Sequence, residues 1–150
     1  MPSQTFSHRA LSTAPAHEVW AAMDDVETWK KIPGVDRIVA SETDDAGLES
    51  FTFEATIGGR AYRGQARRRD RVEGEHISWD IISPDISGAI AVDLESTDAG
   101  TAITVALTLT VEGFLASMFF PVITQALGRG FPEAVTEFAA GFSTPPHSQP

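Results

Sequence analysis

Residues 15–35 read PAHEVWAAMDDVETWKKIPGV, and this stretch shows where a strand gives way to two short helices. Proline favours the first position of a helix, so Pro15 predicts a helix start. Apolar residues that recur at three- and four-residue spacing on one face are Val19, Trp20 and Met23. Acidic residues expected to face water are Glu18, Asp24 and Asp25. A second short helix is predicted over Val26–Lys31, and Pro33-Gly34 ends it.

The residues on either side of this stretch alternate with a period of two. Gln4–Ser12 is predicted to be a strand that runs into the first helix. From Val35 to Glu112, six strands are expected, separated by turns at Asp44–Gly47, Gly58-Gly59, Glu73–Glu75, Ser83–Asp85 and Thr97–Gly100. Gly58-Gly59 fits a two-residue hairpin loop, since glycine tolerates positive φ. The alternation predicts an antiparallel sheet of seven strands with one apolar face.

After Gly113 the apolar period lengthens to between three and four, which predicts a long C-terminal helix. Pro121 is expected to bend this helix, and the stretch from Gly128 to Pro132 to break or kink it again. The second weak point has two interpretations, a gate over a cavity or a bulge without motion. Ser143–Pro150 contains three prolines and is expected to be a disordered tail.

The composition limits the classes of function. A chain of 150 residues has room for one domain, and the absence of cysteine excludes disulfides and thiolate metal sites. A net charge of −10 disfavours nucleic acid as a partner. No export signal is recognised, and the apolar stretch Phe114–Ile123 is too short to span a bilayer, so a cytoplasmic protein without an integral membrane segment is expected. The scattered histidines predict no metal site.

The order of elements resembles the START-like (SRPBCC) superfamily, whose fold is called helix-grip. The segment from Pro15 to Val35 is similar to the entry motif of two bacterial branches, the polyketide cyclase/dehydrase type and the carbon monoxide dehydrogenase accessory type. The resemblance implies an α+β domain over residues 1–142, with a curved seven-stranded sheet and a kinked C-terminal helix over a cavity. Lipids, steroids and polyketides occupy such cavities in the superfamily, so a small hydrophobic molecule is the expected partner.

The residues expected to contact this ligand lie on the apolar face of the sheet and on the C-terminal helix. They are Phe51, Phe53, Tyr62, Arg68, Trp79, Ile81, Ile90, Val92, Met118, Phe119, Val122 and Ile123. A phenol in an apolar lining supplies one oriented hydrogen bond, which suits a ligand site. Trp20 and Trp29 are instead expected to fill the core.

Six of the nine arginines lie between Arg60 and Arg71. If Tyr62 points inward, period two places Gly64, Ala66, Arg68 and Asp70 on its face. The same rule places Arg63, Gln65, Arg67, Arg69 and Arg71 in solvent. An inward Arg68 would need a carboxylate or a ligand oxygen, because an unpaired buried charge costs several kcal/mol or so. The alternative is an ordinary ion pair at the rim of the sheet.

Three functions remain open at this stage. The first is binding or transport of a small hydrophobic ligand by a monomer or homodimer, with no cofactor. The second is a polyketide cyclase/dehydratase-type enzyme in which Arg68 and Tyr62 assist, although no residues form a recognisable catalytic constellation. The third is an accessory or co-chaperone-like interaction protein, with a small or collapsed cavity and a functional outer surface.

Overall fold

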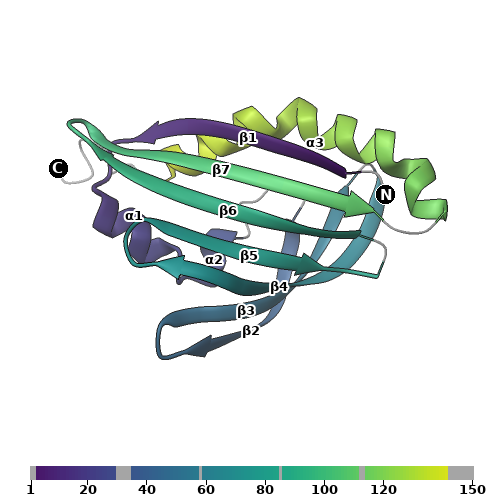
Figure 1. The fold of residues 1–150 in the computed structure, drawn as a ribbon, viewed down its shortest axis with the longest axis horizontal. Helices are drawn as coiled ribbons and strands as arrows, with labels where there is room; N and C mark the ends of the chain where they lie inside the picture. Colours follow the sequence, from purple (N-terminus) through teal and green to yellow (C-terminus); the bar gives the residue numbers. More distant parts are fainter. Residues whose placement is uncertain (1–2, 30–34, 58, 85, 112–113, 142–150) are drawn as a thin grey trace.

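Seven antiparallel strands and three helices make up the computed structural model, which describes residues 3–29, 35–57, 59–84, 86–111 and 114–141 (Figure 1). The strands are β1 (Ser3–Ser12), β2 (Val35–Asp44), β3 (Gly47–Ile57), β4 (Arg60–Val72), β5 (His76–Ile82), β6 (Ile86–Thr97) and β7 (Gly100–Val111). The helices are α1 (Ala16–Ala22), α2 (Val26–Trp29) and α3 (Phe114–Ala140). The strand order β1-β7-β6-β5-β4-β3-β2 confirms one seven-stranded antiparallel sheet.

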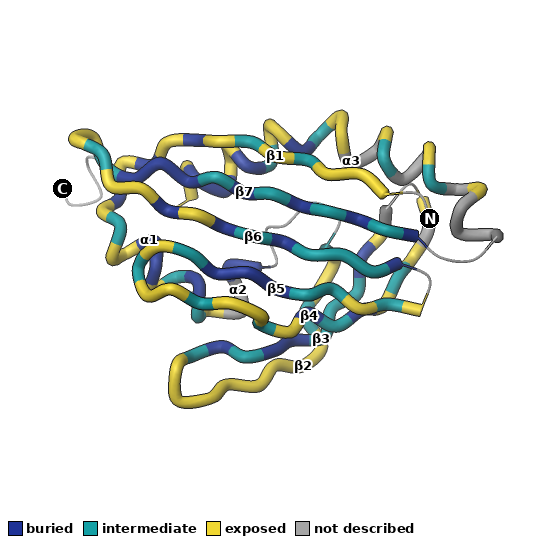
Figure 2. The backbone as a smooth tube through the Cα atoms, viewed as in Figure 1, coloured by how far each residue is buried: buried dark blue, intermediate teal, exposed yellow. Residues whose placement is uncertain are grey.

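The inner face of the sheet carries the core because apolar residues alternate along its central strands. In β7, Ile103, Val105 and Leu107 are buried, whereas the intervening threonine and alanine are half-buried. Figure 2 shows this burial on the central strands and the exposed run of β2 at the sheet edge. The sheet therefore presents one apolar face to the helices.

The long C-terminal helix lies alongside β1 and also contacts β7 and β3 (Figure 1). Its second half buries Phe131, Val135 and Phe138, and the rings of Phe6 and Phe131 are 5.8 Å apart between centroids. The helix runs from Phe114 to Ala140 as one element with Pro121 and Pro132 inside it. The kinks and the gate expected there stay predictions, and the predicted tail lies outside the described residues.

The hairpin turns match the expected positions. Ile57 pairs with Arg60, so a two-residue loop joins β3 to β4, and Gly59 has a φ of 81°. Asp44 pairs with Gly47, and an Asp44 carboxylate oxygen accepts the backbone N–H of Ala46 at 2.8 Å. These turns set the registers of β2, β3 and β4.

A bulge in β4 overturns part of the predicted orientation of its arginines. Arg68 pairs with Trp79 but Asp70 pairs with Ser78, so one extra residue interrupts the period of two. Asp70 therefore lies on the outer face, where the Ser78 hydroxyl donates to its carboxylate at 3.3 Å. Arg71 turns inward, and only 11% of its side chain is exposed. The prediction that Asp70 faces inward and Arg71 faces solvent was wrong.

The inward turn of Arg71 also changes the expected surroundings of Asp24. Arg71 Nη1 donates to Asp24 Oδ1 at 2.8 Å, and the backbone N–H of Leu48 donates to the same oxygen at 3.2 Å. Asp24 was expected to face water, but it joins the end of α1 to β3 and β4. No helix in the described part of the chain is long and apolar enough to cross a membrane.

Candidate ligand-binding site

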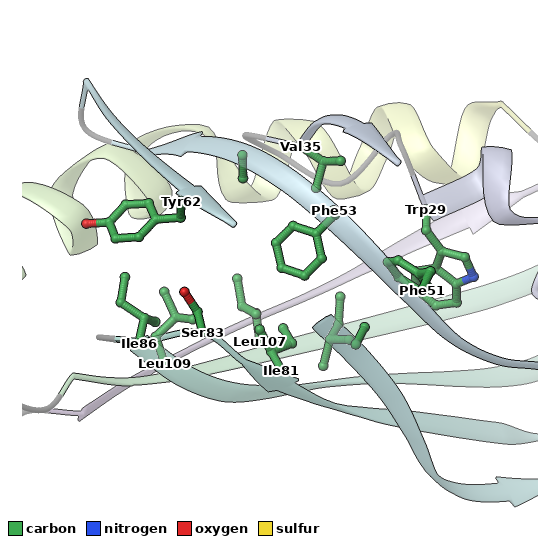
Figure 3. Close-up of a pocket in the computed structure, with 13 residues that line it drawn as sticks. Trp29, Val35, Phe51, Phe53, Tyr62, Ile81, Ser83, Ile86, Leu107 and Leu109 are labelled. Atoms are coloured by element: carbon green, nitrogen blue, oxygen red, sulfur yellow. The ribbon is translucent and has the colours of Figure 1, made fainter. Parts of the chain in front are cut away.

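A cavity opens on the inner face of the sheet (Figure 3). The space available to the centre of a water-sized sphere is about 80 Å³. Its described lining comes from the α2–β2 region and from strands β3 to β7, and it consists of Trp29, Val35, Phe51, Phe53, Ala55, Tyr62, Ala66, Ile81, Ser83, Ile86, Ile90, Leu107 and Leu109. Nearly all of these side chains are apolar, so the cavity favours an apolar occupant.

Small residues in the inner face of the sheet create this space. One row of cross-strand neighbours runs through Phe51, Ala66, Ile81, Gly88 and Leu109. Large side chains alternate in that row with alanine and glycine, which leaves unfilled volume over β4 and β6. Four of these five residues line the cavity.

The inner end of the cavity is aromatic and fixed by packing. The rings of Trp29 and Phe51 stack with centroids 6.1 Å apart, and the ring of Trp79 lies 5.3 Å from Trp29 and 5.4 Å from Phe51. Trp29 Nε1 donates to the Met23 carbonyl at 3.0 Å. Because Trp29 is 1% exposed, this end cannot yield to a ligand without moving the core.

The outer end of the cavity carries its two hydroxyl groups, on Tyr62 and Ser83 (Figure 3). The Ser83 hydroxyl donates to the Arg63 carbonyl at 3.1 Å, which leaves its oxygen lone pairs as acceptors. Phe53, Tyr62 and Ile81 are only half-buried against the core. This end can therefore adapt to a ligand more easily than the inner end.

Five of the twelve residues predicted to contact a ligand line the cavity together. These are Phe51, Phe53, Tyr62, Ile81 and Ile90. Trp79 and Val92 are fully buried in the core beside it, and Met118 is 59% exposed on α3. The side chains of Phe119, Val122 and Ile123 lie outside the part of the structure that is described.

Arg68 does not line the cavity. Its Nη1 donates to the Leu48 carbonyl at 2.9 Å, and its Nη2 pairs with the Asp44 carboxylate. This is the rim ion pair that the sequence left open as the alternative. The Arg68 guanidinium holds the pKa of Asp44 below its ordinary value, mainly through their hydrogen bond. Six residues of strand separate Arg68 from Tyr62, or about 20 Å of backbone at the usual rise.

Sequence reasoning missed eight residues of the lining. They are Trp29, Val35, Ala55, Ala66, Ser83, Ile86, Leu107 and Leu109. Ile86, Leu107 and Leu109 belong to the same alternating series as Ile90 and could have been included on that basis. Ala55 and Ala66 lacked any such indication, because a small inward residue reads as ordinary packing.

The cavity contains no carboxylate, imidazole, lysine or arginine among its described lining residues. Across the described chain, no group of three histidine, aspartate or glutamate side chains is placed to hold a metal ion. The ionic groups instead pair at the rim and on the outer face, as in Arg69–Asp80 at 3.0 Å and Arg37–Glu54 at 2.6 Å. The chemistry of the cavity is therefore that of burial and hydrogen bonding by hydroxyls.

A family model described as polyketide cyclase/dehydrase and lipid transport matches residues 3–142. No curated protein matches the chain. Among solved structures, the Zhui aromatase/cyclase from Streptomyces sp. R1128 superposes with a TM-score of 0.70 at 15% identity, over 92% of this chain and 94% of that one. A START superfamily protein from Mycobacterium smegmatis gives 0.66 at 11% identity, over 90% and 94%.

A third similar structure is the di-domain aromatase/cyclase StfQ from the steffimycin biosynthetic pathway. It superposes with a TM-score of 0.70 at 16% identity, over 94% of this chain and 51% of that one. At such low identities, these neighbours establish the fold only.

Proposed function

Because the chain belongs to the polyketide cyclase/dehydrase and lipid transport family, we propose that it binds a small, mostly apolar molecule in the cavity on the inner face of its sheet. The observation that carries the proposal is a cavity lined by apolar side chains with hydroxyls at one end only. A site for acid–base chemistry would need ionisable groups that converge on the reacting atoms. The described lining supports binding or transport over catalysis.

The dimensions of the cavity limit the ligand. Its volume of about 80 Å³ is well below the ~300–1,000 Å³ of ordinary ligand pockets. A single aromatic ring or a short chain with one polar atom suits this space, with the apolar part against Trp29 and Phe51. A larger ligand would have to displace the half-buried side chains at the outer end, Phe53 and Tyr62.

A matched pair of variants tests the binding site. Ala66→Leu adds three carbons to a residue that lines the cavity and is 2% exposed. Ala89→Leu makes the same change on the outer face of β6, opposite Asp80 and Thr108. We expect Ala66→Leu to weaken binding of 4-fluorophenol, followed by ¹⁹F NMR titration, by at least about tenfold. Ala89→Leu should bind as the wild type does.

The natural ligand can be sought directly. Native mass spectrometry of the protein from its own host, followed by extraction, should find a stoichiometric apolar molecule. An empty protein that also fails to bind 4-fluorophenol and other small aromatic probes would contradict the proposal and favour the interaction-protein alternative. The cytoplasmic location remains part of the proposal.

The cyclase/dehydratase alternative depends on the two hydroxyls at the outer end. Tyr62 and Ser83 are polar groups that could orient or polarise a carbonyl of a bound poly-β-ketone. If the protein turns over such a substrate, Tyr62→Phe should lower the rate far more than it lowers affinity. Equal losses of rate and affinity in this variant would support a binding role alone.

A further inference from the structure

The inward position of Arg71 is not explained by the ligand lining, because Arg71 does not contact the cavity. The bulge at Arg69 places Arg71 opposite Ile77, a fully buried residue of β5. A charged side chain that enters the core side of a sheet is costly unless several groups receive it. Its partners therefore indicate what the bulge achieves.

Three groups receive the Arg71 guanidinium. The Asp24 carboxylate accepts from Nη1 at 2.8 Å and from Nη2 at 3.3 Å, which is a two-point contact. Glu73 Oε1 accepts from Nη2 at 3.4 Å. The guanidinium also lies 4.9 Å from the centroid of the Trp20 ring, and Trp20 Nε1 donates to Glu73 at 2.7 Å. Arg71 thus joins β4 to α1.

Asp24 connects this ion pair to the next turn of the chain. It accepts the Leu48 backbone N–H, and a Cβ at Gly47 would lie 2.2 Å from Asp24 Oδ1. The carboxylate therefore fits against the start of β3 only because residue 47 is glycine. Asp24 is held from two strands at once, by β3 and by β4.

The residue before Asp24 reaches the cavity. The Met23 carbonyl accepts the indole N–H of Trp29, and Trp29 forms the inner end of the cavity by stacking on Phe51. Met23 itself is fully buried, so its carbonyl has a fixed position. A continuous series of contacts thus runs from Arg71 through Asp24 and Met23 to the Trp29 ring.

We propose that Arg71 is a positioning residue for the ligand cavity, which acts through Asp24 to hold the α1–α2 turn and the Trp29 ring in place. The inference rests on the proposed function, because the ring position matters only if a ligand packs against it. The bulge in β4 is then part of the site, since it delivers Arg71 to the inner face. The ordinary alternative is that Arg71 stabilises the fold without affecting the position of Trp29.

The variants Arg71→Met, Arg71→Lys and Arg69→Met separate the two interpretations. Methionine removes the charge and the two-point contact, whereas lysine keeps the charge without the planar fork. Arg69→Met is the matched control on the same strand, because Arg69 is half exposed and pairs with Asp80 on the outer face. Each variant is labelled with 5-fluorotryptophan, and loss of one ¹⁹F resonance in Trp29→Phe assigns Trp29.

We expect Arg71→Met to shift or broaden the Trp29 resonance in the folded, ligand-free protein and to weaken 4-fluorophenol binding by about tenfold. Arg71→Lys should restore part of both effects, and Arg69→Met should change neither. A folded Arg71→Met protein with an unmoved Trp29 resonance and wild-type affinity would overturn the inference. If Arg71→Met does not fold, Asp24→Asn replaces it, because it weakens the ion pair while keeping an acceptor for Leu48.

The spectra also separate this inference from the proposed function. A wild-type protein that binds no aromatic probe contradicts the proposed function, whatever the Trp29 resonance does. A wild-type protein that binds, with Trp29 insensitive to Arg71→Met, contradicts the positioning role alone.

Discussion

Gly88 shows at the scale of one residue how the cavity depends on a missing side chain. It lies on the inner face between Ile81 and Leu109, both of which line the cavity. A Cβ at this position would be 2.1 Å from the Thr108 carbonyl oxygen, which belongs to the backbone of β7. The two strands approach each other more closely here than a larger residue would permit.

The corresponding prediction concerns Gly88→Ala. Because the obstructing atom is backbone, the strands must separate, and we expect the free energy of unfolding to fall by about 1–3 kcal/mol. Urea denaturation measures this change. Ala91→Ser, on the outer face of the same strand, is the control and should change stability by less than about 0.5 kcal/mol. A wild-type unfolding midpoint for Gly88→Ala would contradict the close approach.

At the scale of elements, β4 and α3 each depart from regular expectations. The period of two holds in β4 from Tyr62 to Arg68 and fails after the bulge, because one extra residue reverses every later side chain. In α3, two glycines occur inside a helix, where glycine costs stability through its backbone freedom. Their surroundings differ. A Cβ at Gly128 would lie 3.1 Å from Phe6 Cε1, whereas none of the described atoms lies within 4 Å at Gly130.

This difference predicts opposite merits for two alanine substitutions in α3. Gly130→Ala should raise the free energy of unfolding by about 0.5–1 kcal/mol, because it removes backbone entropy without a clash. Gly128→Ala should give a smaller gain, since Phe6 must shift on β1. Thermal unfolding of the two variants tests the order, and a larger gain for Gly128→Ala would contradict the packing of α3 on β1.

At the scale of the whole molecule, a net charge of −10 coexists with arginine–carboxylate pairs that hold the sheet edge. Arg68 lowers the pKa of Asp44 below 3.8, and Arg37 lowers the pKa of Glu54 below 4.5, in each case chiefly through a hydrogen bond. A carboxylate whose pKa is lower in the folded state stabilises the fold above its unfolded pKa. That contribution disappears as the pH falls through the folded value.

Stability should therefore be nearly constant from neutral pH to about pH 5 and should fall below about pH 4.5, where these carboxylates begin to be protonated. Urea midpoints measured from pH 7 to pH 3 test this. Asp44→Asn should reduce the acid-dependent fall. Asp98→Asn is the control, because Asp98 is exposed and forms no ion pair with a described residue. Equal pH profiles for wild type and Asp44→Asn would contradict the role of the Arg68 pair.

Local patterns in the sequence were sufficient to predict the strands, the long helix, the hairpin turns and the family. Alternation along β6 and β7 identifies inward residues such as Ile90, because side chains in a regular strand face opposite sides in turn. The aromatic residues Phe51, Phe53 and Tyr62 were placed at the cavity for the same reason. These features depend on neighbours in the chain, which a sequence displays directly.

Only the tertiary structure decided where the cavity lies and what supports it. The hollow forms where Ala66 and Gly88, distant in sequence, fall into one cross-strand row, and no local pattern records that meeting. The bulge at Arg69 reversed Arg71, and Trp29 became the inner end of the cavity because Asp24 and Met23 hold its turn. The physical reason is that unfilled volume and long-range ion pairs depend on which strands and helices meet in space.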